Sequence, residues 1–265
     1  MYITVDGKDY WIQSDGEGYP IVLLHGFTGS SKTWDHFIGR WKKQFRVITI
    51  DLPGHGNTQL DQTVRMEEIC DDINDILSSL DINEAHFLGY SMGGRTALSF
   101  SMMYSDKVGK LILESSSPGL AESHQQIARQ AQDEALAQRI EQQGVISFVK
   151  YWENIPLFDS QKNLSDSTQK KLRQERLNQT EKGLAASLRG MGTGVQPSWW
   201  KKLPILSNDV LILVGEFDSK FIDIGRQMND IIKASELKIV ANAGHAIHLE
   251  QAQQFEKMVT SFLNN

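Results

Sequence analysis

Short, mostly apolar runs alternate with stretches of helical periodicity along most of this 265-residue chain. Runs of this length and composition are typical of strands buried on both faces of a sheet. They occupy residues 21–24, 47–50, 85–88, 108–113 and 210–214, with a shorter one at 239–240. Helical spacing of apolar residues occurs between them, at 34–42, 66–80, 92–104, 222–234 and 255–263. The alternation predicts an α/β fold with an open, mostly parallel sheet and helices on both faces.

The first residues follow a different pattern. Two short runs rich in β-branched and aromatic residues, 3–5 and 10–12, flank the dipeptide Asp6-Gly7. Asp-Gly between two such runs is a strong signal for a hairpin turn. We therefore expect a β-hairpin before the parallel part of the sheet.

The segment from about Pro118 to about Pro197 contains no convincing strand and is rich in Gln, Glu, Arg and Ala. Helical patches lie at 127–142, 146–152, 167–179 and 184–191. Ligands of open parallel sheets bind beyond the carboxyl ends of the strands, where an inserted segment can fold over them. The sequence thus predicts a core of residues 1–117 and 197–265 and a helical cap of residues 118–196.

The overall charge limits the classes of partner. The formal net charge is −6 and the isoelectric point about 5.7, which gives no electrostatic footprint for nucleic acid or an anionic membrane. No apolar run approaches the roughly 20 residues that span a bilayer, and residues 1–13 do not have the pattern of a signal peptide. We expect a cytoplasmic protein without nucleic-acid or membrane partners. The oligomeric state cannot be predicted from the sequence.

The segment Gly89-Tyr90-Ser91-Met92-Gly93 matches the pattern G-x-S-x-G. It follows an apolar strand and opens a helix, which is the context of a nucleophile elbow. The tight turn leaves no room for side chains two residues before and after the serine, and glycine occupies both positions. The pattern predicts that Ser91 is the nucleophile.

His25-Gly26-Phe27 directly follows the first long apolar run. In a fold with a nucleophile elbow, this loop supplies one backbone N–H of an oxyanion hole, and the residue after the nucleophile supplies the other. The predicted donors are Phe27 and Met92.

The general base should come last in the chain, after an acid. Ala243-Gly244-His245 lies in a late loop from which His245 could reach over the top of the sheet. His248 is the competitor, but it starts the final helix and is better read as a supporting or solvated residue. We interpret His86 as a core histidine and His55 as a residue of a structural loop.

Two carboxylates, Glu216 and Asp218, follow the run at 210–214. Asp218 is favoured because a Gly-x-x-Asp pattern at this place is typical of proteins with a nucleophile elbow. Such an acid would hold the tautomer of His245 and stabilise its charged form. The alternative is an N-cap for the next helix.

Together these motifs resemble the α/β-hydrolase superfamily, and three segments narrow the resemblance. They are similar to the 2-succinyl-6-hydroxy-2,4-cyclohexadiene-1-carboxylate synthases of menaquinone biosynthesis, in the stretches Gly89-Tyr90-Ser91-Met92-Gly93-Gly94-Arg95, Glu114-Ser115-Ser116-Ser117-Pro118-Gly119-Leu120 and Gly215-Glu216-Phe217-Asp218-Ser219-Lys220-Phe221. The resemblance extends from His25 to His245. It implies a lyase without metal or cofactor, in which Ser91, activated by His245, removes a proton and pyruvate leaves. The oxyanion hole would hold the enolate.

The resemblance also implies substrate-binding roles for Tyr90, Arg129, Trp152 and Arg176. Arg95 has an independent argument, because a tricarboxylate substrate needs fixed cations and Arg binds carboxylates through two oxygens. It lies one turn into the helix behind the nucleophile, where superfamily members often carry small or apolar residues.

Two other functions remain open. A carboxylic-ester or carbon–carbon-bond hydrolase would use the same triad, with Ser91 forming a covalent intermediate in a mainly apolar pocket. A non-catalytic ligand-binding protein could also use this fold, because fold alone does not fix function.

Overall fold

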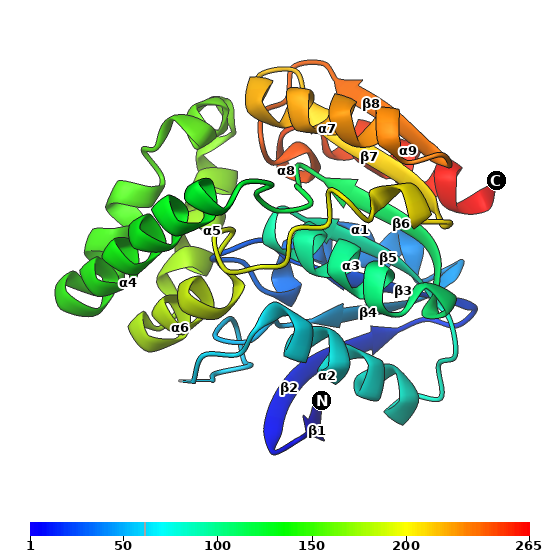
Figure 1. Cartoon of the computed structure of the whole chain (residues 1–265), viewed down its shortest axis with the longest axis horizontal. Helices are drawn as coiled ribbons and strands as arrows, with labels where there is room; N and C mark the ends of the chain where they lie inside the picture. The colour runs from blue at the N-terminus through cyan, green and yellow to red at the C-terminus, as the bar shows by residue number, and fades with distance from the viewer. Residues whose placement is uncertain (61) are drawn as a thin grey trace.

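The computed structural model describes residues 1–60 and 62–265 and contains one eight-stranded sheet (Figure 1). The strands are β1 (Tyr2–Val5), β2 (Lys8–Asp15), β3 (Tyr19–Leu24), β4 (Phe45–Ile50), β5 (Ala85–Tyr90), β6 (Val108–Glu114), β7 (Asp209–Gly215) and β8 (Ser235–Val240). Their spatial order is β1-β2-β4-β3-β5-β6-β7-β8. All pairs from β4 to β8 are parallel, so the predicted α/β fold with a mostly parallel sheet is confirmed.

The expected hairpin is present. β1 and β2 pair antiparallel, with Val5 opposite Lys8, and the turn between them has positive φ at both Asp6 (48°) and Gly7 (72°). Two positive φ angles are the signature of the turn whose twist matches that of paired strands. β2 then pairs antiparallel with β4 and joins the hairpin to the parallel sheet.

Helices cover both faces of the sheet, as the alternation predicted (Figure 1). One buried apolar cluster joins the sheet to α2 (Met66–Ser79), α3 (Met92–Met103) and α7 (Ser219–Ile231). A second joins the other face to α1 (Asp35–Trp41) and α9 (Ala252–Asn264). The short elements are α8 (Ile247–Glu250) and the 3₁₀ turns at Ser31–Trp34, Ser105–Lys107 and Leu203–Ile205.

All described elements between β6 and β7 and before the last 3₁₀ turn are helical, and they form the cap seen at the left of Figure 1. They are α4 (Ser123–Trp152), a 3₁₀ segment (Pro156–Asn163), α5 (Asp166–Leu177) and α6 (Glu181–Met191). Gly144, with a φ of 79°, divides α4 into two arms. The cap has its own apolar core, built around Ile140, Phe148 and Leu184. The division at residues 117/118 and 196/197 remains a prediction.

Two glycines bring the backbones of cap and core together. A Cβ on Gly54, whose φ is 78°, would collide with the backbone of Gly183 in α6. A Cβ on Gly183 would collide with the carbonyl of Gly54 in turn. The cap therefore rests on the loop after β4 through main-chain atoms, at a distance that only glycine permits on either side.

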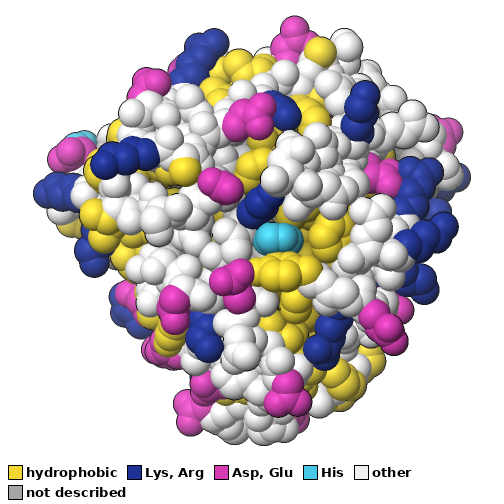
Figure 2. Space-filling model, turned by 90° about the vertical axis from the view of Figure 1, so that its right-hand side faces the viewer, with side chains coloured by type: hydrophobic (Ala, Val, Ile, Leu, Met, Phe, Trp, Pro, Cys, Tyr) yellow, Lys and Arg dark blue, Asp and Glu magenta, His cyan; other side chains and the backbone are white. Residues whose placement is uncertain are grey.

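The end of the molecule away from the cap has a mixed surface. Basic and acidic side chains are interspersed there, with small hydrophobic patches between them (Figure 2). Within the described ranges, no helix is both long and apolar enough to cross a membrane.

Candidate active site

Ser91 lies in the sharp turn between β5 and α3, at the carboxyl edge of the sheet that faces the cap. Its φ is +50°, a left-handed conformation that is strained for serine. The turn is held by a 2.8 Å hydrogen bond from the Ser91 N–H to the Glu114 carbonyl. A Cβ at Gly89 would collide with the backbone of Gly93, and one at Gly93 with that of Leu24. The elbow therefore needs glycine at both positions.

His245 joins Ser91 to Asp218 in one row of hydrogen bonds. Its Nε2 lies 3.0 Å from the Ser91 Oγ, and its Nδ1 lies 2.6 Å from an oxygen of Asp218. Both His245 and Asp218 are buried, at 2% and 6% exposure. Asp218 stands at the N-cap position of α7, but its carboxylate caps no helix N–H and is directed to His245 instead. This arrangement suits a hydroxyl that gives its proton to an imidazole.

The competing acid lies elsewhere. The carboxylate of Glu216 accepts a 2.9 Å hydrogen bond from the backbone N–H of Asn242, on the surface. Asp218, rather than Glu216, therefore contacts His245 in the structure.

Phe27, in the loop after β3, and Met92, directly after Ser91, line the same cavity. Within residues 1–60 and 62–265, neither N–H has a hydrogen-bond acceptor. The carbonyl of Gly26, in the same peptide unit as the Phe27 N–H, accepts hydrogen bonds from His25 Nδ1 (2.8 Å) and Gly29 N–H (3.0 Å). Because the peptide is planar and trans, fixing this carbonyl turns the Phe27 N–H the opposite way.

The protonation state of His25 follows from its contacts. Its Nε2 accepts a 2.9 Å hydrogen bond from the backbone N–H of Leu52, so Nδ1 carries the proton that reaches the Gly26 carbonyl. Burial lowers the pKa of His25 to about 4. His25 is thus a neutral imidazole with a fixed tautomer at neutral pH.

Ser91 and His245 open onto a cavity of about 210 Å³ beneath the cap. Three cationic side chains line it, namely Arg95, Arg129 and Lys220, and none of the described lining residues is Asp or Glu. Apolar side chains, among them Phe27 and Leu136, make up much of the remaining wall. The cavity can accept a ligand with several carboxylates and an apolar body.

The cationic side chains of the cavity repel one another. Burial and the charge of Arg129 lower the pKa of Arg95 to about 10. Burial, followed by the charge of Arg129, also lowers the pKa of Lys220. Arg129 has one carboxylate partner, a 2.8 Å ion pair with Asp133 one helical turn away, whereas Arg95 donates to the carbonyl of Met191 and the amide oxygen of Gln196. An anion in the cavity would relieve this repulsion.

Several polar groups of the cavity wall are buried and have no hydrogen-bond partner among the described residues. They are the indole Nε1 of Trp152 and the hydroxyls of Ser115 and Ser116. A buried donor without an acceptor is costly, so each marks a place where ligand or water oxygen would be bound. Tyr90 also lines the cavity, and burial, with the nearby Glu114, raises the pKa of its phenol, so the hydroxyl stays protonated.

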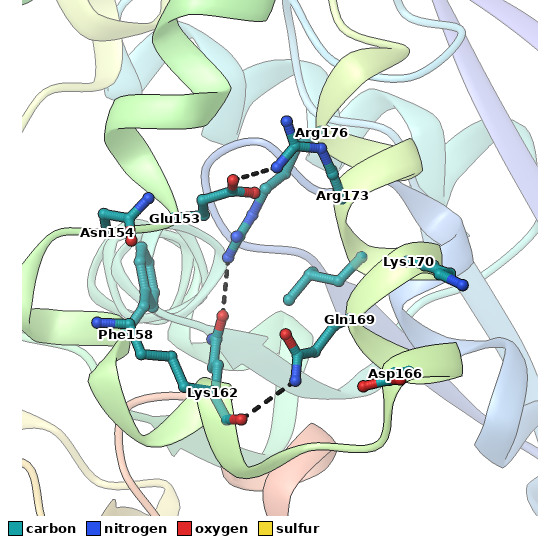
Figure 3. Close-up of a pocket in the computed structure, with 11 residues that line it drawn as sticks. Glu153, Asn154, Phe158, Lys162, Asp166, Gln169, Lys170, Arg173 and Arg176 are labelled. Carbon is teal, nitrogen blue, oxygen red and sulfur yellow. Dashed lines mark hydrogen bonds and ion pairs between the residues drawn. The ribbon is translucent and has the colours of Figure 1, made fainter.

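Arg176 lies outside the lining of this cavity. The residue is 5% exposed, and its guanidinium lies 5.0 Å from the ring centroid of Phe158 and donates a 2.9 Å hydrogen bond to Gln161. Figure 3 shows it in a neighbouring cleft of the cap, together with Glu153, which is paired with Arg173. Phe158 lines both the cleft and the Ser91 cavity.

Lys220 and Glu114 carry no sequence signal that marks them as functional residues. Lys220 lies in the first turn of α7, beside Asp218, and its lining position depends on how the cap covers that turn. Glu114 is the last residue of β6, is fully buried, and accepts hydrogen bonds from both the backbone N–H (3.0 Å) and Nδ1 (2.9 Å) of His248. The ring of His248 in turn packs edge-on against Tyr90.

The histidines at 248, 86 and 55 are all buried. His248 is buried on α8, a separate short helix, so it is a supporting residue rather than a solvated one. His86 accepts a 3.0 Å hydrogen bond from the N–H of Lys110 between strands, and His55 is buried beside His25. None of these three lines the Ser91 cavity.

The chain is similar to several known proteins. A family model described as the alpha/beta hydrolase fold matches residues 19–252. A protein of Bacillus subtilis (strain 168), provisionally named a 2-succinyl-6-hydroxy-2,4-cyclohexadiene-1-carboxylate synthase, is 39% identical over 99% of this chain and 98% of its own length. The synthase of that name from Escherichia coli O139:H28 is 29% identical over 87% of this chain and 88% of its own.

Solved structures give the same grouping. The structure of MenH from S. aureus superimposes with a TM-score of 0.92 at 37% identity, covering 96% of this chain and 97% of that one. A malate-bound thermophilic esterase from Thermogutta terrifontis superimposes with a TM-score of 0.87 at 26% identity, over 99% and 96%. The chain therefore belongs to the α/β-hydrolase fold family and, within it, to the family of the 2-succinyl-6-hydroxy-2,4-cyclohexadiene-1-carboxylate synthases.

Proposed function

We propose that this chain is a carbon–oxygen lyase of menaquinone biosynthesis. It eliminates pyruvate from 2-succinyl-5-enolpyruvyl-6-hydroxy-3-cyclohexene-1-carboxylate and forms 2-succinyl-6-hydroxy-2,4-cyclohexadiene-1-carboxylate. The substrate is a small tricarboxylate. In this proposal the reaction takes place in the cytoplasm and needs no metal, cofactor, nucleic acid or membrane.

In the proposed mechanism Ser91 is the base. His245 accepts the hydroxyl proton, with Asp218 stabilising the imidazolium, while the Ser91 oxygen removes the proton next to the succinyl ketone. The electron pair moves onto the ketone oxygen, and the N–H groups of Phe27 and Met92 stabilise the resulting enolate. As the enolate collapses, the ring C–O bond breaks, and the enolpyruvyl group takes up a proton and leaves as pyruvate.

The observation that carries the proposal is the charge of the cavity. The hydrogen-bonded Ser91 and His245 open onto a space with three cations and no carboxylate among its described lining residues. Arginines in a closed site are the best partners for carboxylates, because each can form two charge-assisted hydrogen bonds. We propose that Tyr90, Arg95, Arg129, Trp152 and Lys220 bind the substrate.

A role of Arg176 in substrate binding depends on the position of the Phe158 ring. Phe158 stands between its cleft and the Ser91 cavity and contributes to the lining of both. A rotation of the Phe158 ring would bring the guanidinium and a substrate carboxylate together. Arg176 would then bind substrate only after this ring has moved.

A hydrolase acting through a covalent Ser91 intermediate is the main alternative. The triad geometry fits it equally well, but an ester or diketone with a mostly apolar body would bring no anion to the positive charges of Arg95, Arg129 and Lys220. The cationic lining therefore favours the tricarboxylate.

A coupled assay tests the proposal. Chorismate and 2-oxoglutarate, with the preceding synthases, generate the substrate in place, and pyruvate is followed after this protein is added. We expect stoichiometric pyruvate release well above the spontaneous rate, and its loss in Ser91→Ala. An unchanged rate would remove the lyase assignment and direct attention to short-chain esters and vinylogous diketones.

A further inference from the structure

A single glutamine of the cap holds the loop that carries Phe27. Gln179 lies in the turn between α5 and α6 and is 7% exposed. Its amide NH₂ lies 3.2 Å from the carbonyl oxygens of both Thr28 and Gly29. Its side-chain oxygen accepts a 3.0 Å hydrogen bond from the backbone N–H of Gly56 in the loop after β4. One side chain thus joins the cap to two loops of the core.

The loop held by Gln179 has a strained backbone. Thr28 has a φ of +70°, which is strained for a β-branched residue. Among the described residues, the hydrogen bonds to the Thr28 and Gly29 carbonyls come from Gln179 alone. Without this amide, both carbonyls would lose their hydrogen bonds, in a loop whose backbone is strained at Thr28.

The contact leads to the Phe27 N–H in three short steps. Gln179 holds the carbonyl of Gly29, and the N–H of Gly29 donates to the carbonyl of Gly26. That carbonyl belongs to the peptide unit whose N–H is the one on Phe27. Because a trans peptide is planar, the direction of this N–H follows the direction of the carbonyl.

Two further contacts support the same loop from the cap. Glu175, on α5, accepts hydrogen bonds from the hydroxyls of Ser30 (2.8 Å) and Thr33 (3.2 Å). The ring of Phe27 packs edge-on against Trp152 on α4, with centroids 5.5 Å apart. Side chains of the cap therefore contact both the backbone and the side chains of the loop.

We propose that Gln179 is a positioning residue of the oxyanion hole, which sets the direction of the Phe27 N–H when the cap is seated on the core. This inference rests on the role proposed above for Phe27. It assigns the cap a part in transition-state stabilisation, besides covering the substrate. A cap that lifts would release Gln179 and weaken the oxyanion hole in the same movement.

The test compares Gln179→Ala and Gln179→Met with Gln174→Ala. The methionine keeps most of the buried volume if the alanine variant folds poorly. Gln174 is an exposed residue of α5 whose side chain, among the described residues, is hydrogen-bonded to Asn178 alone. Two readouts are used: steady-state pyruvate release, and the rate at which a fluorophosphonate labels Ser91. Labelling forms a Ser91 O–P bond, expels fluoride and uses the oxyanion hole whatever the natural substrate is.

We expect both Gln179 variants to lower kcat about tenfold or more with little change in KM, because an oxyanion donor acts mainly in the transition state and losing one outright costs roughly 10²–10³-fold. Labelling should slow in parallel, while Gln174→Ala matches the wild type. A raised KM at unchanged kcat, or labelling as fast as in the control, would overturn the inference. If the wild type released no pyruvate and labelling still depended on Gln179, the lyase proposal would fall and the positioning role would stand.

Discussion

The Nε2 of His245 and the Oγ of Ser91 are 3.0 Å apart, within hydrogen-bonding distance. The serine is held there by a backbone with positive φ, and the imidazole by a 2.6 Å contact to Asp218. These contacts give the hydroxyl and the imidazole the geometry that proton transfer requires, so binding must bring the acidic C–H to the Ser91 oxygen.

Asp218→Asn should separate orientation from charge. The amide can hold the imidazole, but it favours the wrong tautomer and cannot stabilise the imidazolium. We expect kcat for pyruvate release to fall by roughly 10²–10⁴-fold with a small change in KM. Glu216→Gln is the matched control, because the hydrogen bond of that carboxylate within the described ranges is to the surface N–H of Asn242, and it should retain wild-type kcat. Equal losses in the two variants would argue against the assignment of Asp218.

Arg129→Ala tests the cationic cavity. Losing a charge-assisted contact of about 1.5 kcal/mol should raise KM roughly tenfold. Arg139→Ala is the control, since this residue lies on the same helix and stacks on Tyr151 rather than lining the cavity. Equal KM values for both variants in the pyruvate assay would contradict the proposed binding of carboxylates by Arg129.

Trp152→Phe removes the buried indole N–H and keeps most of the ring. Because this N–H has no described partner in the protein, its loss should not lower the free energy of unfolding by more than about 1 kcal/mol. If the N–H binds substrate, KM should rise severalfold. Urea unfolding and the pyruvate assay measure the two effects, and a large loss of stability at constant KM would assign Trp152 to packing alone.

Mild acid should destabilise the protein through its buried histidines. Burial lowers the pKa of His25 to about 4 and, with repulsion from His25, that of His55 to about 3. Between pH 6.5 and about 4 the unfolded chain therefore binds protons that the folded chain does not, so the free energy of unfolding falls as the pH decreases. Each histidine contributes at most about 1.4 kcal/mol per pH unit.

Urea unfolding at pH 7.0, 6.0 and 5.0 measures this slope. His55→Asn should flatten it, whatever its effect at pH 7, whereas His36→Asn, at an exposed position, should leave it as in the wild type. A slope that is unchanged in His55→Asn would show that this histidine is not the source.

The sheet and the row from Ser91 to Asp218 could be anticipated because they depend on local signals. Apolar runs mark buried strands, and the glycines around Ser91 mark a turn whose geometry permits nothing larger. Lys220 and Arg176 could not be placed in the same way. Whether either faces the cavity depends on how the cap lies over the core, and no periodicity in the sequence reports that. Arg176 is expected to bind substrate; it lies in a cleft beside Phe158, and its role stays a prediction.

The hydrogen-bonded pair of Glu114 and His248 could not be predicted from the sequence, because it also depends on the tertiary structure. Glu114 ends an apolar strand and could have been a surface residue, and its partner is far away in the sequence. Only the parallel order of the sheet brings the end of β6 next to α8.

The reciprocal contact of Gly54 and Gly183 has a consequence for protein engineering. The obstacle on each side is main chain, so no rotamer can relieve a collision. A foreign cap grafted onto this core, to change the substrate, would have to reproduce this backbone approach before any of its side chains could be chosen. Chimeras should thus be matched first at this pair of glycines, and libraries that vary the cap should leave both unchanged.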